Sequence, residues 1–452
     1  MNWLIHELRL IARSRLSLAT LVLLLALSAL AVWSGLHESA RQRQTIARLA
    51  PLQAQDAAAV ATRYADSPDA GNPAYYAFHA TWDLPSDTAF LAMGLRDVAP
   101  QALRVRTLGL QAQLYEGEIF NPELALPGRF DFAFVLIYLA PLFVIALLHD
   151  LVSGERQSGR LRLLLSLPDG GRLWRRRALL RYALLCAAVA LPVLAGLVLS
   201  GATPLSAGVV LAVIASYLTF WTGLSLRVAR RGWRSVANAT ALMGAWALLT
   251  LVLPALANVA LTRALPVHQG VDLMLAQRQA VHGAWEVPRA QTMQRFLAGH
   301  PQFKHTAPLP AGFHWKWYFA FHQLGDDSVA QQVAEYRAGL LARQEWTHRL
   351  GWLLPGVGAQ TVLHRAADTD LQAQLAYQDR TAAFHAEVRH FFYPYLFNER
   401  RFGTQDFARL PRFTAPPHAP VSWSAQLSVL LALGGAIAAW GLWGMGRLRV
   451  ND

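Results

Sequence analysis

The stretch Leu147–Pro168, LLHDLVSGERQSGRLRLLLSLP, decides how the rest of the chain is arranged. It continues an apolar run, turns polar, and then mixes leucine with arginine. The pattern predicts a short basic amphipathic helix on a membrane surface, bent at Gly154 and Gly159 and ended by Pro168. An element of this kind, joined rigidly to a membrane span, can pass force to a soluble partner. Its apolar side is expected to hold Leu161, Leu163, Leu164, Leu165 and Leu167, and its charged side Arg156, Arg160 and Arg162.

The composition indicates a membrane protein. Of the 452 residues, 54% are hydrophobic and only 15% are charged, whereas soluble domains carry about 25% charged residues. The single cysteine, Cys186, excludes a disulfide within the chain and a metal site built from several thiolates. Because it falls in an apolar run, we expect it to be a small packing residue.

The fold class expected is an all-α polytopic membrane protein with six transmembrane helices. An N-terminal amphipathic helix and two large extracytoplasmic insertions, mainly helical or α+β, complete it. The layout is an inner-face helix at 1–15, spans at 16–36, 132–148, 178–199, 206–226, 236–261 and 424–445, a coupling region at 149–177, and outer segments at 37–130 and 262–422. A cleaved signal peptide ending near Ala29-Leu30-Ala31 is the alternative for the first span. A retained span is preferred because the helical pattern continues beyond it.

The distribution of arginine orients these spans. The four segments placed on the inner side are 1–15, 150–181, 227–234 and 447–452. Their net charges are +2, +5, +4 and +1, which account for nearly all of the formal charge of +13. Cytoplasmic loops carry such an excess of basic residues, so both termini are expected in the cytoplasm. The positive charge therefore indicates how the spans are oriented. We also expect the basic segments to contact anionic lipid head groups, and we expect no nucleic-acid partner.

Glu155-Arg156, Gly159 and the run Leu164–Pro168 resemble the E-R-x-x-G-x-x-x-x-L-L-x-x-P signature of type-two ABC exporter permeases. The signature follows the second span, as it does in that family, and the resemblance extends over the whole layout of spans. The two outer segments are longer than in compact members. In this respect the chain resembles the subfamily with large extracytoplasmic insertions, which is related to the permease of nitrous-oxide-reductase maturation.

The resemblance implies the permease subunit of a bacterial ABC transporter in the inner membrane, either an exporter or a machine that transmits mechanical work. It implies that segment 151–168 docks into a separate ATPase, which would hold ATP and Mg²⁺, with no cofactor or metal in this chain. The other partners implied are a second copy or a homologous permease, membrane lipid and a periplasmic protein. The coupling residues implied are Glu155, Arg156, Gly159, Leu164, Leu165, Ser166, Leu167 and Pro168.

The chain itself has no Gly-x-x-x-x-Gly-Lys-Ser/Thr loop and no Gly-x-Ser-x-Gly turn, so we expect no enzyme activity of its own. The expected spans hold almost no ionisable residues, which argues against proton-coupled transport. Their polar side chains are as consistent with a translocation path as with hydrogen bonds between helices. The candidates for the path are Ser216, Tyr217, Thr219, Thr222, Asn238 and Thr240. A membrane-anchored scaffold or assembly factor without an ATPase is the alternative function.

The second outer segment is expected to be a helical domain. Capping-box patterns at Ser328 and Thr369 predict helices over roughly 328–350 and 370–392, and another is expected over 271–298. The segment is rich in histidine, but no HExxH or HxxxH pair occurs, so dispersed histidines are favoured over a metal site or a membrane-embedded enzyme. Two aromatic runs, 313–321 and 391–397, are expected in the domain core or at a membrane interface rather than on a partner surface.

Overall fold

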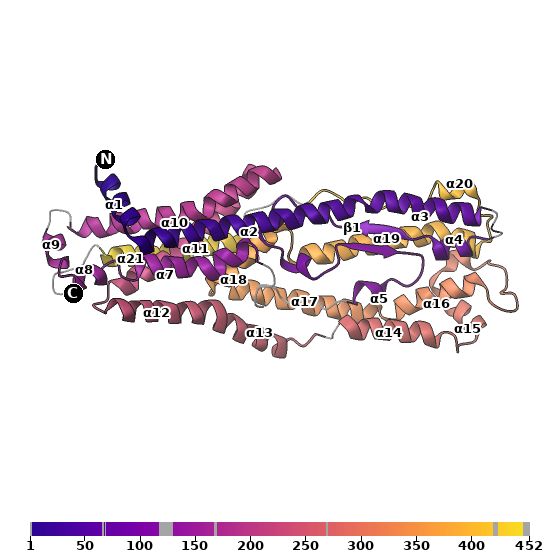
Figure 1. The fold of residues 1–452 in the computed structure, drawn as a ribbon. Helices are drawn as coiled ribbons and strands as arrows, with labels where there is room; N and C mark the ends of the chain where they lie inside the picture. Colours follow the sequence, from indigo (N-terminus) through magenta and orange to yellow (C-terminus); the bar gives the residue numbers. More distant parts are fainter. Residues whose placement is uncertain are drawn as a thin grey trace.

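The computed structural model describes residues 2–65, 67, 69–116, 130–166, 170–267, 270–418 and 424–445. The molecule is a long rod of helices, with one small two-stranded sheet among the described residues (Figure 1). The six helical segments long and apolar enough to cross a membrane gather in one half of the rod. The predicted class, an all-α polytopic membrane protein, is confirmed.

The spans are continuous helices or helices with one irregular turn. The first is α2 (Arg15–Ala47), and the second is α6 (Phe132–Phe134), η3 (Val135–Leu139) and α7 (Ala140–Leu148). They are followed by α10 (Gly170–Ser200), α11 (Pro204–Ala229), the series α12 (Ser235–Ala247), η4 (Leu248–Val252) and α13 (Leu253–Ala264), and α21 (Ala425–Met445). Before them comes α1 (Asn2–Arg13), which ends where the Ser14 hydroxyl caps α2 by accepting from Ser17 N–H.

Pro141 explains how the second span is attached to its neighbours. Proline has no N–H, so the carbonyl four residues earlier, that of Ile137, lacks its helical donor. The turn concerned, η3, is a π-helix, and the Tyr217 hydroxyl of α11 donates to Ile137 O at 2.9 Å. The indole N–H of Trp246 in α12 donates to Tyr138 O at 3.1 Å. The carbonyls freed by the irregular turn therefore join the second span to the fourth and fifth.

The fourth and sixth spans pack with their backbones in contact. A Cβ on Gly223 of α11 would lie 2.5 Å from Ala438 N, and one on Gly441 of α21 would lie 2.5 Å from Gly223 O. A Cβ on Gly434 would lie 2.6 Å from Ser216 O. Small residues permit this approach, which supplies van der Waals contact where apolar burial supplies no driving force. Helix α11 is consequently the buried centre of the bundle, while the α12–α13 series is mostly exposed.

The first insertion starts as an extension of the first span. Helix α2 breaks at Arg48, three residues before Pro51, and α3 (Leu49–Tyr64) continues it. After α3 come α4 (Gly71–Tyr76), β1 (His79–Trp82), η1 (Ala89–Leu91), η2 (Gly94–Asp97), β2 (Ala102–Val105) and α5 (Gln111–Leu114). Strands β1 and β2 are antiparallel, with His79 opposite Val105 and Trp82 opposite Ala102.

The second insertion supplies most of the outer helices. These are α14 (Gly270–Gly283), α15 (Arg289–Gly299), η5 (Pro301–Phe303), α16 (Trp315–Ser328), α17 (Ala330–Leu350), α18 (Pro355–Ala367), α19 (Leu371–Phe397) and α20 (Thr404–Phe407). The helix expected over 271–298 is two helices. The capping box expected at Ser328 is wrong, because its hydroxyl donates to Gly325 O and closes α16. Helix α19 is capped by Asp370, whose side chain accepts from Ala373 N–H at 2.9 Å.

Both insertions fold into one domain, which we call the outer domain after the side of the membrane predicted for it. The buried Asp326 carboxylate of α16 accepts from the N–H groups of Leu110 and Gln111 in the first insertion, at 3.0 and 3.1 Å. It also accepts from Arg389 of α19 at 2.8 Å. A buried charge is tolerated only with such partners, so Asp326 fixes the two insertions against each other. Most of the two aromatic runs lies in this core, including Trp317, Phe319, Phe321, Phe392, Tyr393 and Phe397.

Candidate functional site

The predicted coupling segment consists of two short helices at the end of the rod where α1 lies (Figure 1). Helix α8 (Ser153–Gln157) is followed by a turn and by α9 (Leu161–Ser166). The turn has a Schellman geometry: Gly159 N–H donates to Arg156 O and Arg160 N–H donates to Glu155 O, both at 3.0 Å. Gly159 has φ +74°, a left-handed conformation that glycine adopts readily. The spacing E-R-x-x-G thus puts Glu155 and Arg156 where their carbonyls accept the two hydrogen bonds of the turn. It puts Gly159 where the chain takes the left-handed conformation.

The Glu155 side chain secures α8 against two other elements. It accepts from Arg160 Nε at 2.9 Å and from Arg177 of α10 at 3.2 Å. Arg177 also donates to Glu7 of α1 at 3.0 Å. Glu7 is buried and the Arg177 side chain is only 13% exposed, so this chain of charges lies mostly away from solvent. It links the amphipathic helix, the coupling segment and the third span.

Further hydrogen bonds join the segment to the second and fifth spans. The Ser153 and Ser235 hydroxyls lie 2.8 Å apart, and the Asn238 amide donates to His149 O at 3.1 Å. The Arg181 guanidinium of α10 donates to Leu147 O at the end of α7. A force on α8 and α9 would therefore reach the second, third and fifth spans together.

The leucines of α9 were expected on one apolar side of the helix, but the structure places them on two sides. Leu161 is buried, and Leu164 and Leu165 are half-buried and pack against the core of the bundle. Leu163 points the other way and is 67% exposed. With about 100° between successive helical residues, positions i, i+3 and i+4 share a face that i+2 opposes. Leu163 is thus an exposed apolar residue that is not part of the signature. Arg160 and Arg162, which precede it in the sequence, are also exposed. Leu167 and Pro168 lie outside the described residues.

The candidates for a translocation path lie in contacts between and within helices. Ser216 donates to Ala212 O at 2.7 Å, Thr219 donates to the Tyr182 hydroxyl at 2.9 Å, and Tyr217 and Asn238 make the bonds given above. Thr222 is buried and Thr240 is exposed on the side of the bundle. The structure does not bring these six side chains together, and their role in transport stays a prediction.

Helix α18 is the element that sequence reasoning missed. It belongs to the second insertion, yet every one of its residues except Arg365 is buried. It packs against α11, α21, η3 and η4, that is, against four spans. A Cβ on Gly356 would lie 3.5 Å from Ile137 and 3.6 Å from the Tyr217 hydroxyl, both within the bundle. Figure 1 shows α18 between the bundle and the outer half of the rod. Its apolar sequence indicated a buried helix. The same pattern, however, is found in a helix buried among membrane spans and in one buried in the core of a soluble domain.

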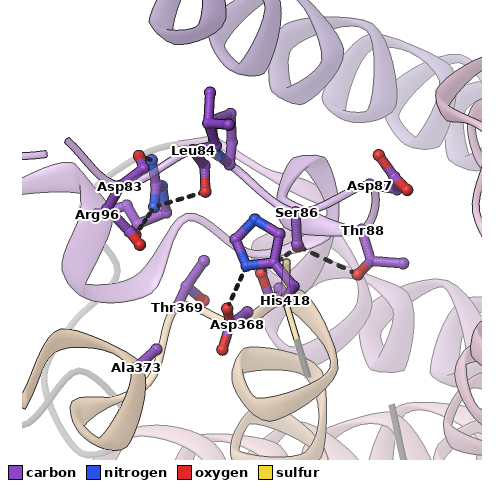
Figure 2. Close-up of polar contacts among 12 residues, drawn as sticks. Asp83, Leu84, Ser86, Asp87, Thr88, Arg96, Asp368, Thr369, Ala373 and His418 are labelled. Carbon is purple, nitrogen blue, oxygen red and sulfur yellow. Dashed lines mark hydrogen bonds and ion pairs between the residues drawn. The ribbon is translucent and has the colours of Figure 1, made fainter. Parts of the chain in front are cut away.

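The carboxyl end of α18 is fastened to the first insertion. The last carbonyls of a helix lack helical donors, and here the Ser86 and Thr88 hydroxyls donate to Ala367 O and Ala366 O, both at 2.6 Å. Figure 2 shows Ser86 and Thr88 together with His418 and Asp368. The contact of 2.7 Å between His418 and Asp368 holds the chain segment that precedes the last span. A cavity of about 360 Å³ lies beside them.

Electrostatics keep Asp368 charged at this junction. Burial acts to raise the pKa of its carboxyl, but the hydrogen bond and charge of His418, with the charges of Arg365 and Arg380, outweigh it. The net effect is a pKa below the usual range. A charged Asp368 can hold His418, and with it the chain that leads into α21.

The outer histidines do not gather into a metal site. Within the described ranges, no group of three or more His, Cys, Asp or Glu side chains could hold a metal ion, and His268 lies outside those ranges. Burial lowers the pKa of His79 to about 4 and, with the nearby charges of Arg389 and Arg106, lowers that of His322 to about 3. His385 is also buried, and its pKa is well below the ordinary value for the same reason. These three are neutral packing residues at pH 7.

Comparison with known proteins gives one family match. A model described as Domain of unknown function (DUF3526) matches residues 272–415, which run from α14 to the segment beyond α20. The match includes α18 and α19 and leaves out the coupling segment. Neither a curated protein nor a solved structure matches the chain.

Proposed function

We propose that this protein is the transmembrane subunit of a bacterial inner-membrane machine driven by a separate ABC ATPase. The ATPase docks on α8 and α9, holds ATP and Mg²⁺, and moves the spans. The observation that carries the proposal is the Schellman turn at Gly159 with Glu155 bound to Arg177. It gives the resemblance to the permease signature a structural reason, since each residue of E-R-x-x-G has a defined task in shaping a rigid docking element.

The exposed side of α9 is the docking surface proposed. Leu163 supplies an apolar contact, and Arg160 and Arg162 supply positive charge around it. Leu161, Leu164 and Leu165 support the helix from behind by packing on the bundle. An apolar centre surrounded by a polar rim is the usual arrangement of a protein–protein interface.

The burial of α18 favours transmission of mechanical work over transport through the bundle. Movement of the second span reaches α18 through η3 and Tyr217. Helix α18 is part of the second insertion, and the hydroxyls of Ser86, Thr88 and Thr369 join it to the first insertion. The outer domain would then act on a periplasmic protein or other substrate. A second copy or a homologous permease would complete the machine, as the resemblance implies.

The test is an affinity pull-down in mild detergent, with neighbouring genes co-expressed and ATPase activity assayed. We expect an ATPase to co-purify with the wild type and Leu163→Asp to weaken its binding by about tenfold or more, the scale of an interface hot spot. Trp233→Asp is the matched control, because Trp233 is an exposed apolar residue of another inner loop. If no ATPase binds the wild type, the scaffold or assembly factor without an ATPase becomes the better function.

A further inference from the structure

The outer domain contains an apolar groove that the proposed machine does not use. Its volume is about 520 Å³, within the usual range for ligand sites. It lies between α3, β1, Phe384 of α19 and the chain segment 407–414. We call it the α3 groove. It is lined by Ala50, Gln53, Ala54, Ala57, Ala58, Ala61, His79, Ala80, Trp82, Phe384, Phe407, Ala408, Leu410, Pro411, Arg412, Phe413 and Thr414.

The groove exists because α3 presents methyl groups where larger side chains would fill the space. The five alanines recur at helical spacing between Ala50 and Ala61, which corresponds to about 16 Å along the helix. No described residue of α3 is buried. Polar contacts hold the helix in place instead: Gln53 bonds the backbone of Phe78 and Ala80, and Asp56 pairs with Arg104 at 2.6 Å. The helix is thus fixed by its polar residues while its alanine side stays open.

The opposite wall is aromatic and uncharged. Trp82, Phe384 and Phe413 form one set of edge-to-face contacts there, with ring centroids 5.3 and 5.4 Å apart. His79 is 2% exposed, its Nδ1 lies 3.3 Å from Pro411 O, and its Nε2 is buried with no hydrogen-bond partner among the described residues. Burial lowers its pKa to about 4, so the ring is neutral at pH 7. The wall therefore carries no charge that would exclude a hydrocarbon chain.

The one charged side chain in the described lining is Arg412, which is exposed. An extended peptide is a poor occupant, because it needs backbone partners and Gln53 already accepts from Ala80 N–H on this side of β1. A hydrocarbon chain needs none. We propose that the α3 groove binds a long-chain fatty acid, with its acyl chain between the alanines and the aromatic rings and its carboxylate at Arg412. This inference does not rest on the ATPase.

The experiment uses the full chain in lipid nanodiscs and palmitic acid that carries a photoreactive diazirine. We expect labelling within 50–61 and 407–414, removed by competition with unlabelled palmitate. Ala57→Trp fills the groove and should lower the labelling there by about tenfold or more. Ala59→Trp is the matched control, because Ala59 lies on the same helix, is exposed and does not line the groove. Hydrogen exchange of the outer domain checks that both variants fold.

The head group is tested separately with Arg412→Gln. Loss of an exposed ion pair should weaken palmitate binding by roughly two- to fivefold and leave the methyl ester of the same acid unaffected. Labelling that stays within the spans, or that is equal in wild type and Ala57→Trp, would overturn the proposal. So would competition by a lysophospholipid but not by palmitate, or an equal loss of acid and ester in Arg412→Gln.

Discussion

At the scale of single residues, Gly159 shows most directly how a motif becomes a shape. Its φ of +74° lies in the left-handed region, and a Cβ there would meet no atom within 4 Å. The position therefore requires glycine for backbone conformation and not for lack of space. Gly154 is different, because it lies inside α8 and a Cβ there would make an ordinary contact with Asp150 at 3.7 Å.

This difference gives a matched pair of variants. Gly159→Ala should destabilise the turn by about 1 kcal/mol, the cost of a left-handed alanine. Hydrogen exchange of the Gly159 and Arg160 amides in the full-length protein should then accelerate by roughly fivefold, because these bonds open locally. Gly154→Ala should leave that exchange unchanged or slower, since alanine favours helix. Equal protection in Gly159→Ala and wild type would contradict the Schellman account.

At the scale of elements, α9 and the helices of the outer domain show what burial does to a chemical pattern. The run of leucines in α9 is divided between a packed face and an exposed one. Helical geometry separates Leu163 from Leu161 and Leu165, and the packing of the bundle decides which face is buried. In the outer domain, burial lowers the pKa of His79, His322 and His385, so these side chains are neutral packing groups at pH 7.

Those buried histidines predict that acid destabilises the outer domain. Their folded pKa values lie below the unfolded value of about 6.5, so the unfolded chain binds more protons as pH falls. The stability they contribute is complete above pH 6.5 and is lost as the pH falls from there toward about 4 for His79. The free energy of unfolding should drop by about 1 kcal/mol per pH unit for each histidine.

Hydrogen exchange of the outer domain between pH 7 and pH 5, corrected for intrinsic rates, measures this slope in the intact protein. His79→Phe should make the slope shallower, because it removes one of the three groups whose pKa is lowered by burial. A wild-type stability that does not change over this interval would show that the histidines are not held neutral by the fold.

At the scale of the whole molecule, α18 joins the two halves of the rod. It packs against four spans, while its last carbonyls and the Thr369 hydroxyl bind the first insertion. Any change in the bundle at η3 or α11 must therefore displace α18 or be resisted by it. The closeness of Gly356 to Ile137 offers a way to lock this junction.

We predict that a disulfide between Cys substituted for Gly356 and for Ile137, in a Cys186→Ala background, uncouples the outer domain. A Cβ on residue 356 would lie 3.5 Å from Cγ2 of Ile137, so the side chains at these two positions are neighbours, and formation of the bond is checked by the loss of free thiol on oxidation. With the bound ATPase, ATP-dependent changes in hydrogen exchange of the outer domain should disappear on oxidation and return on reduction, while ATPase binding persists. An unaltered response in the oxidised protein would argue against transmission through α18.

The sequence alone determined the class of protein, the existence of six apolar helices and the position of the bend at Gly159. These signals are local: a span is a sum over about 20 consecutive residues, and the turn at Gly159 depends on neighbours five residues apart.

The tertiary structure decided what those elements contact. Only the packing shows that Tyr217 satisfies the carbonyl of Ile137, that Leu163 faces away from Leu164, and that α18 enters the bundle. The α3 groove likewise needs Ala57 and Phe413, more than 300 positions apart, to face each other across a gap. Burial and pairing over such separations depend on which surfaces the folded chain brings together, and a local pattern of residues does not contain that information.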